Sequence, residues 1–341
     1  MTETGTEKEK KILSLGFIGV GWIGRNRMEV LINKANAKPV AIAEPYSTNA
    51  ADALTAAAGA TLVQTPQEVY NIDKLDGVVI ATPSAIHAAQ SIAALKSGKA
   101  VFCQKPLGRT ASEVKEVIQA SQEAGKLLSV DMSYRHTKAF QAVYDCINNG
   151  EIGKIYAVDL IFHNAYGPDK EWFYDIEQSG GGCVMDLGIH MADMALCCLG
   201  FPKINEVKSH LFSKGIKLQP QEKKVEDFAK VFMLTEDDTA ISIECSWHVS
   251  AGQDAVIEAV FYGTEGGVAF KNCNGSFYDF KAEKYKGTYK ENLVVPPDDW
   301  SGRAGLVWAS QLLAGHGYNS ISAAEYLQTA QLIDRIYGRQ D

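Results

Sequence analysis

The first third of the chain alternates short apolar runs with helical patterns, and this alternation restricts the fold more than any other feature. The apolar runs lie in KILSLGFIGVG, AKPVAIAEPY, DGVVIATPS, AVFCQKP and KLLSVDMSY. Strands that are apolar along their whole length are buried on both faces, and the helices between them serve as crossovers between parallel strands. The pattern therefore predicts an N-terminal α/β domain with a doubly wound parallel sheet.

The pattern changes after about Tyr134. One helix follows in KAFQAVYDCINN, and the later segments mostly alternate apolar and polar residues, which favours an antiparallel sheet with one polar face. These segments are residues 154–163, 204–213, 226–235, 239–248, 254–263 and 266–272. For the last helix, Ser322 and Glu325 have the spacing of a capping box. We expect a disordered lead at 1–11, a first domain at 12–133 and an α+β domain at 134–341.

Composition excludes several classes of protein. The 341 residues suffice for two domains, and the net charge of -8 argues against nucleic acid and membrane surfaces, whose partners are usually basic. No uninterrupted apolar run approaches the ~18–20 residues of a membrane span, and the first residues, MTETGTEKEKK, are polar. The seven cysteines are odd in number and include no CxxC pair, so we expect reduced thiols, no metal site and a cytoplasmic location.

A glycine-rich segment follows the first predicted strand and opens the first predicted helix. In GFIGVGWIGR, Gly19, Gly21 and Gly24 have GxGxxG spacing, and Trp22 and Ile23 stand between the last two. The first glycine permits a tight turn, the second lets the backbone approach a pyrophosphate, and the third lets helix and strand pack closely. The segment predicts a dinucleotide bound at the helix N-terminus. The alternative is a glycine-rich strand end without a ligand.

Glu44 ends the second predicted strand, twenty residues after Gly24. A carboxylate at this position accepts hydrogen bonds from both hydroxyls of an adenosine ribose and repels a 2′-phosphate. The next basic residue along the chain is Lys74, so no basic residue close in sequence would neutralise such a phosphate. We therefore favour NAD over NADP as the cofactor. The alternative is an ordinary solvated acid at a strand end.

Two later strand ends carry polar residues, and ligands bind at strand C-termini in a doubly wound sheet. In ATPSAIH, we expect Thr82 and Pro83 to line the cofactor crevice, while His87 is either a site residue or a surface or capping histidine. In VFCQKPLG, Lys105 ends another strand, where we expect the apolar approach to partly desolvate its ammonium. Such a lysine donates to an alcohol or carbonyl oxygen, although a lone lysine at a strand end is more often a solvated charge.

An acid–imidazole–acid series lies in the apolar segment QSGGGCVMDLGIHMADMALC. Asp186, His190 and Asp193 are spaced by four and three residues, which places them on one face of a helix. The glycines at 180–182 allow the backbone to turn close to a ligand. The series is therefore either the face of an active site or a polar cluster satisfied within the core.

Taken in order, the glycine-rich loop, TPSAIH, QKP and GGCVMDLGIH resemble the motifs of the glucose–fructose oxidoreductase, inositol dehydrogenase and rhizopine catabolism (Gfo/Idh/MocA) family. The resemblance extends over nearly the whole chain. It implies an N-terminal Rossmann domain and a C-terminal α+β domain with a large, mostly antiparallel open sheet. It also implies NAD(P)-dependent oxidation or reduction of sugars and cyclitols, and a cis peptide bond before Pro106.

The resemblance assigns roles to individual residues. Lys105 matches the catalytic, substrate-contacting lysine of the family's E-K-P motif. Asp186 and His190 match its D-x-x-x-H pattern, in which the histidine is the acid/base and the aspartate hydrogen-bonds a substrate hydroxyl or orients the imidazole. Gln104 departs from the family's glutamate. Its amide still suits a cofactor ribose, but it removes a negative charge beside Lys105.

Four more residues are candidates for substrate contact. Tyr134 and Arg135 lie at the domain junction, where hinge packing is the alternative. In FHNAYGPDKEWF, the amide of Asn164 suits sugar hydroxyls, and the ring of Trp172 suits a sugar face. We assign Trp247 to packing.

These expectations combine into an NAD-dependent oxidoreductase that transfers a hydride between nicotinamide and a ring secondary alcohol of a sugar, glycoside or cyclitol. His190 and Lys105 would handle the proton. Two alternatives stay open: glycoside cleavage through transient oxidation and elimination, and a non-catalytic regulator that senses NAD or sugar. An open antiparallel sheet leaves a face to cover, so we expect a homodimer or homotetramer through that sheet.

Overall fold

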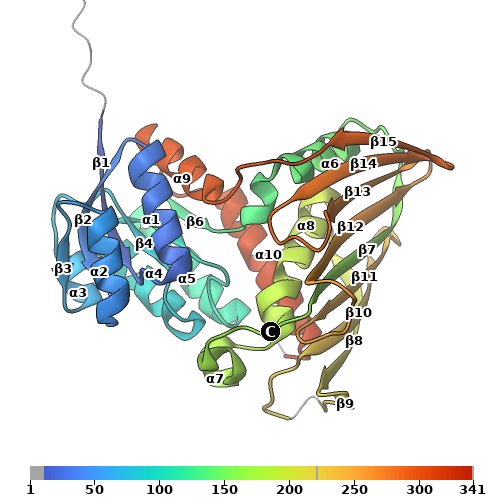
Figure 1. Ribbon diagram of the computed structural model, residues 1–341, viewed down its shortest axis with the longest axis horizontal. Helices are drawn as coiled ribbons and strands as arrows, with labels where there is room; N and C mark the ends of the chain where they lie inside the picture. The colour runs from blue at the N-terminus through green and yellow to red at the C-terminus, as the bar shows by residue number, and fades with distance from the viewer. Residues whose placement is uncertain (1–10, 220–221, 340–341) are drawn as a thin grey trace, which may run out of the picture.

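The computed structural model describes residues 11–219 and 222–339, which form two sheets with helices between them (Figure 1). Apart from Lys11, the predicted lead lies outside the described residues. The fold class expected from the sequence is confirmed, because a parallel sheet is followed by a larger, mostly antiparallel one.

The first sheet has six parallel strands in the order β3-β2-β1-β4-β5-β6. Its strands are β1 (Leu13–Ile18), β2 (Ala37–Ala43), β3 (Thr61–Val63), β4 (Gly77–Ile80), β5 (Ala100–Cys103) and β6 (Leu128–Val130). The connecting helices are α1 (Trp22–Lys34), α2 (Ser47–Ala56), α3 (Pro66–Tyr70), α4 (His87–Lys96) and α5 (Ala111–Ala124). The strand order reverses between β1 and β4, which is where such a sheet binds its ligand.

The second sheet has nine strands in the order β15-β14-β13-β12-β7-β11-β10-β8-β9. Its strands are β7 (Ile155–Asn164), β8 (Ile204–Ser213), β9 (Ile216–Lys217), β10 (Phe228–Thr235), β11 (Ala240–Ser246), β12 (Ala255–Gly263), β13 (Gly267–Asn272), β14 (Phe280–Lys286) and β15 (Tyr289–Val294). Strands β7 and β11 pair in parallel, and the other pairs are antiparallel. The six predicted segments are all strands, whereas β9, β14 and β15 lie outside them.

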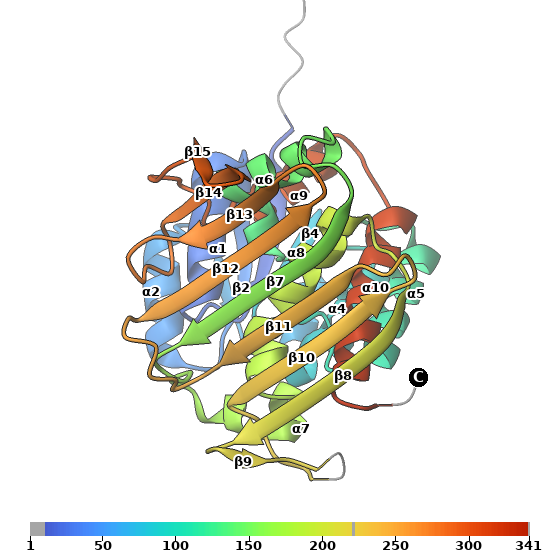
Figure 2. The ribbon, with the colours of Figure 1, turned by 90° about the vertical axis from the view of Figure 1, so that its right-hand side faces the viewer.

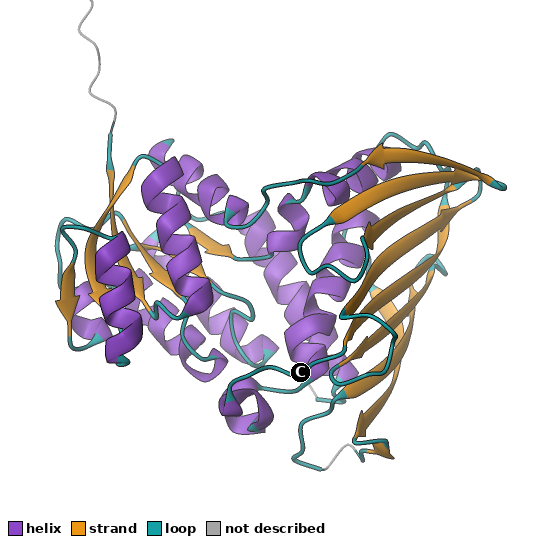
Figure 3. Ribbon diagram, viewed as in Figure 1, coloured by secondary structure: helices purple, strands orange, loops and turns teal. Residues whose placement is uncertain are grey.

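Helices cover one face of the second sheet and fill the space between the two sheets (Figure 3). They are α6 (Lys138–Asn148), α8 (Ile189–Leu199) and α10 (Ser320–Ile336), with the short α7 (Ile176–Ser179) near the junction. Figure 2 looks onto the other face of the sheet, where the strands lie in front of these helices. The segment Ile176–Leu199 is long and apolar enough to cross a membrane, but 83% of its most apolar window is buried within the fold.

The chain returns to the first sheet near its end. Helix α9 (Arg303–Leu313) places Trp308, which is fully buried, against Phe102 with ring centroids 5.7 Å apart. The same indole covers Gly77, where a Cβ would lie 2.8 Å from the ring. The predicted domain boundary at 133 and 134 follows the end of β6, yet the core of the first sheet includes this later helix.

The cap of the last helix differs from the prediction. The side chain of Asn319 accepts hydrogen bonds from the N–H groups of Ile321 and Ser322, so α10 begins at Ser320. The predicted capping box at Ser322 and Glu325 is therefore wrong, because an asparagine three residues earlier is itself a favoured cap. The Glu325 side chain binds Arg135 instead.

Candidate active site

The glycine-rich loop joins β1 to α1 and leaves room for a ligand at one glycine. Gly19 has a φ of 79°, and a Cβ there would lie 2.7 Å from the carbonyl oxygen of Ala81. A Cβ on Gly24 would collide with the backbone of Gly19. At Gly21 the nearest atoms are 3.8 Å away, and none of the side chains that the structure describes caps the helix that follows. The free N–H groups of the first helical turn and the space beside them fit the pyrophosphate of a dinucleotide.

Glu44 lies beside this loop at the end of β2. Its carboxylate accepts hydrogen bonds from the N–H groups of Val20 at 2.7 Å and Tyr46 at 3.0 Å. Trp22 and Ile23, which open α1, are exposed and half-buried respectively. The acid is thus held at the loop edge where a bound dinucleotide would present its ribose.

His87 connects the segments that follow β4 and β5. It is 2% exposed, and its ring nitrogens lie 2.7 Å from the carbonyl oxygens of Thr82 and Pro106. Burial lowers the pKa of this imidazole. The contacts do not support the predicted cofactor contact for His87, because backbone encloses the ring on both sides. Thr82 and Pro83 are half-buried at the end of β4.

Gln104 points into a buried polar cluster. Its amide nitrogen donates to the carboxylate of Asp131, and the same oxygen accepts from Arg27 Nε at 2.6 Å. The other oxygen of Asp131 is buried and has no partner among the described residues. All three side chains are buried. Donation to Asp131 therefore fixes the orientation of the Gln104 amide.

Lys105 and Asp186 meet from separate folding units. Lys105 follows β5, and Asp186 lies in a π-helical turn, Val184–Gly188, that precedes α8. The ammonium donates to Asp186 Oδ1 at 2.8 Å and to its backbone oxygen at 2.7 Å. The buried indole of Trp247 donates to Asp186 Oδ2 at 3.1 Å, so this residue does more than pack. The Lys105–Pro106 peptide bond is cis, as the resemblance implies.

His190 lies at the start of α8 without an internal partner. It is 7% exposed, its ring lies edge-on to Tyr134 with centroids 4.8 Å apart, and neither nitrogen hydrogen-bonds to a described residue. Burial, and then the charge of Lys105, lowers the pKa of this imidazole well below its ordinary value. Asp186 is bound to Lys105 and Trp247, so its contacts do not support the predicted role of orienting the imidazole.

Glu226, which no motif in the sequence marks, anchors the turn before α8. Its buried carboxylate accepts hydrogen bonds from the N–H groups of Gly182 at 3.0 Å and Val184 at 2.9 Å and from the Tyr337 hydroxyl at 2.8 Å. Burial raises the pKa of this carboxyl. A Cβ on Gly181 would collide with Tyr337, and one on Gly182 with the Glu226 backbone. These two glycines therefore permit the turn to pack closely against Tyr337 and Glu226.

Arg135 and Asp193 form an ion pair away from His190. The guanidinium binds both oxygens of Asp193, at 2.6 and 2.7 Å, and Glu325 at 2.6 Å. These bonds hold the 3₁₀ turn Ser133–His136 to α8 and α10, so the predicted substrate contact of Arg135 is not supported. Tyr134 is buried and stacks on Trp300 with centroids 5.5 Å apart.

The loop after β7 packs beside the Asp186 side of the site. The Asn164 side chain accepts the N–H of Tyr166 at 2.8 Å. Trp172 stacks on Phe173 with centroids 3.8 Å apart, and Phe173 lies edge-on to Trp247 at 6.3 Å. The substrate contacts of Asn164 and Trp172 stay predictions.

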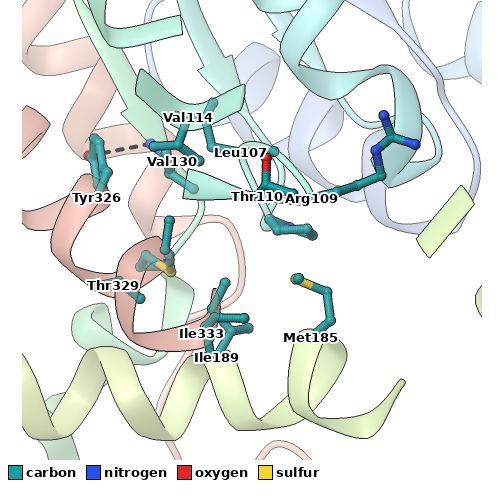
Figure 4. A pocket seen from close by; sticks show the side chains of 14 residues that line it. Leu107, Arg109, Thr110, Val114, Val130, Met185, Ile189, Tyr326, Thr329 and Ile333 are labelled. Atoms are coloured by element: carbon teal, nitrogen blue, oxygen red, sulfur yellow. Dashed lines mark hydrogen bonds between the residues drawn. The ribbon is translucent and has the colours of Figure 1, made fainter. Parts of the chain in front are cut away.

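A small cavity lies beside residues 106–110, which follow β5 (Figure 4). Its volume is about 20 Å³, which is room for about one water molecule. Most of its lining side chains are apolar, and they come from the loop after β5, α5, the end of β6 and the loop after it, the turn into α8, α8 itself and α10: Leu107, Val114, Val130, Met132, Met185, Ile189, Tyr326 and Ile333. It is too small for a sugar, so it is not a substrate site.

The strand order and the glycine loop define a Rossmann dinucleotide-binding protein. A family model described as an oxidoreductase family with an NAD-binding Rossmann fold matches residues 13–132, and a GFO/IDH/MocA C-terminal domain matches 140–269. The two matches together span most of the chain. The protein belongs to the Gfo/Idh/MocA family.

Curated relatives match parts of the chain. It is 33% identical over 150 residues to D-glucoside 3-dehydrogenase of Escherichia coli (strain K12), which is 44% of this chain and 43% of that protein. It is 28% identical over 259 residues to inositol 2-dehydrogenase of Rhizobium meliloti (strain 1021), which is 75% of each. The chain spans about half the length of the first relative and three quarters of the second.

Solved structures share the fold over nearly the whole chain. KijD10, a 3-ketoreductase from Actinomadura kijaniata in complex with NADP and TDP-benzene, has a TM-score of 0.82 at 20% identity, covering 96% of this chain and 97% of that one. Levoglucosan dehydrogenase in complex with NADH and levoglucosan has a TM-score of 0.80 at 23% identity, covering 96% of each. At such identities the likeness shows the fold alone.

Proposed function

We propose that the protein is an NAD-dependent oxidoreductase that acts on a ring secondary alcohol, or the matching ketone, of a sugar, glycoside or cyclitol. The ion pair between Lys105 and Asp186 at the junction of two domains, with His190 four residues further along the same segment as Asp186, is the observation that supports this most. The names of the curated relatives, which act on glucosides and inositol, support the substrate class. A bound nicotinamide supplies the hydride acceptor or donor, and this chain's residues handle the proton.

His190 is the proton acceptor in oxidation and the proton donor in reduction. Its lowered pKa keeps the imidazole neutral at pH 7, and its ring nitrogens, which have no hydrogen-bond partner within 11–219 and 222–339, are free to bind a substrate hydroxyl. Lys105 polarises the reacting oxygen. Two of its three N–H groups are bound to Asp186, so one remains for the substrate. Asp186 and Trp247 position the ammonium.

The cofactor preference follows from Glu44. Its carboxylate lies beside the glycine loop with two backbone donors, where it favours ribose hydroxyls and opposes a 2′-phosphate. Structures of the same fold hold NADP in one case and NADH in another. Titration of the protein with NADH and NADPH tests the preference. Tighter binding of NADPH would contradict it.

We also propose that two or four copies assemble through the outer face of the second sheet, in the cytoplasm. That face (Figure 2) carries large exposed side chains such as Tyr156, 55% exposed, and Phe232, 46% exposed. Light scattering at micromolar concentration tests the assembly, and a monomer would contradict it. All seven cysteines are free thiols, and most are buried, which suits a reducing compartment.

A panel of polyols and glycosides with NAD and NADP, followed by the absorbance of reduced nicotinamide, tests the activity. In the variant His190→Ala we expect turnover to fall about 10²- to 10⁴-fold, because a general acid/base is lost. Binding of NADH should be unchanged. Near-normal turnover would remove His190 from the mechanism, and glycoside cleavage without net NAD consumption would favour oxidation followed by elimination.

A further inference from the structure

We infer that Lys170, in the second domain, binds the pyrophosphate of the dinucleotide across the domain junction. The inference rests on the proposed function, since it adds a residue to the predicted cofactor site. Lys170 lies in the loop between β7 and the 3₁₀ turn Glu171–Tyr174, far along the chain from the glycine loop. No motif marks it in the sequence.

The geometry brings this lysine to the one open position of the glycine loop. A Cβ built on Gly21 would lie 3.8 Å from Lys170 Nζ and 3.8 Å from Asn49 Nδ2. Asn49 is in the first turn of α2. Three kinds of donor therefore converge on the same space: the N-terminal turn of α1, an amide and an ammonium. Such a set matches a group with several anionic oxygens.

The charges around Lys170 leave it available for a ligand. Asp169 and Glu171 flank it in the sequence, yet Lys170 forms no ion pair with a carboxylate in the described ranges. The side chain is exposed, so ligand binding does not have to displace an internal partner. The ligand group is the pyrophosphate, because Gly21 lies at the helix N-terminus, where a pyrophosphate binds. It is not a 2′-phosphate, because the Glu44 carboxylate at the ribose position would repel that group.

This contact has a consequence for the two domains. The glycine loop belongs to the first domain and Lys170 to the second, so a dinucleotide bound to both would hold the domains together. Because Lys170 is exposed, solvent screens its contact with the ligand, and we expect the contact to change the dissociation constant about tenfold.

The test uses the full chain with Lys170→Met, Lys170→Arg and the control Lys115→Met. Lys115 lies on α5, is also exposed and forms no ion pair with a described carboxylate. Dissociation constants are measured for NADH and NADPH by coenzyme fluorescence and for ADP-ribose, which has the pyrophosphate but no nicotinamide, by calorimetry. We expect Lys170→Met to weaken all three by about the same factor, about tenfold. Lys170→Arg and Lys115→Met should bind like the wild type.

Three outcomes would overturn the inference. Unchanged binding of ADP-ribose by Lys170→Met removes the pyrophosphate contact and leaves the proposed function intact, because the wild type still binds NADH. A loss confined to NADPH assigns Lys170 to a 2′-phosphate instead. A wild-type protein that binds no dinucleotide at all removes both the inference and the proposed function.

Discussion

Replacing Gln104 by glutamate should destabilise the protein in a way that depends on pH. In the structure the Gln104 amide donates to Asp131, which also binds Arg27, and all three side chains are buried. A glutamate there is the residue that the family resemblance leads one to expect, yet in this chain it would set a second carboxylate against Asp131. The perturbation therefore tests whether the cluster depends on a neutral donor.

The expected loss of unfolding free energy is the smaller of two costs: the repulsion between two carboxylates, or the protonation of one of them. Two carboxylate oxygens about 3 Å apart repel by about 5 kcal/mol at an effective dielectric constant of about 20. Keeping a proton on one of them costs about 1.4 kcal/mol for each pH unit above the ordinary glutamate pKa of about 4.3. At pH 7 protonation costs about 3.7 kcal/mol and is the cheaper route. The protonated glutamate can donate to Asp131 as the amide does.

Protonation of the introduced glutamate sets the direction in which the stability of the variant changes with pH. The carboxyl would have a higher pKa in the folded than in the unfolded protein, so the variant loses stability as pH rises above about 4.3. We expect a deficit in unfolding free energy of about 1 kcal/mol at pH 5 and of about 3–4 kcal/mol at pH 7.

Urea unfolding of the wild type and Gln104→Glu, followed by circular dichroism from pH 5 to pH 8, measures this deficit. Gln104→Met is the matched control, because it removes the donor without adding a charge and its deficit should not vary with pH. A Gln104→Glu deficit that is equal at pH 5 and pH 8, or absent at pH 8, would refute the reasoning.

Three other predictions concern the site and its support. Trp247→Phe removes the hydrogen bond from the indole N–H to Asp186, which contributes about 1.5–3 kcal/mol. We therefore expect steady-state assays to show turnover lowered at least about tenfold. Titration with NADH should show unchanged binding. Arg135→Met leaves two carboxylates without their cation and should cost about 3 kcal/mol of unfolding free energy in urea, with turnover retained. Because the pKa of His190 lies well below its ordinary 6.5, the imidazole stays neutral as pH falls, and kcat for oxidation should remain flat from pH 8 to about 6.5. A decline centred near pH 7 would contradict this.

The sequence predicts the parts of the site whose chemistry is local. The glycines at 19, 21 and 24 have backbone requirements that few other residues meet, and their position between a strand and a helix is visible in the pattern. Lys105 is found because it ends a buried strand. The order of the motifs identifies the family, and alternation identifies six strands of the second sheet.

The remaining parts depend on contacts between distant segments. Trp247 stands in an apolar strand end, and nothing in the sequence shows that its N–H meets Asp186. Glu226 and Tyr337 look like surface residues until the fold brings them to the turn before α8. Lys170 reaches the glycine loop only through the packing of the two domains. Each pairing is set by the tertiary structure, which residue spacing does not report.

The late return of α9 to the first sheet has a consequence for synthesis on the ribosome. Trp308 covers Phe102 and Gly77, but it is translated after the whole second sheet. The nascent N-terminal half therefore emerges with an uncovered apolar surface, although N-terminal domains usually fold first during translation. Chaperones that shield this surface would have to act until residues 303–313 leave the exit tunnel, and we expect a gene fragment that stops near codon 133 to leave Phe102 and Gly77 uncovered.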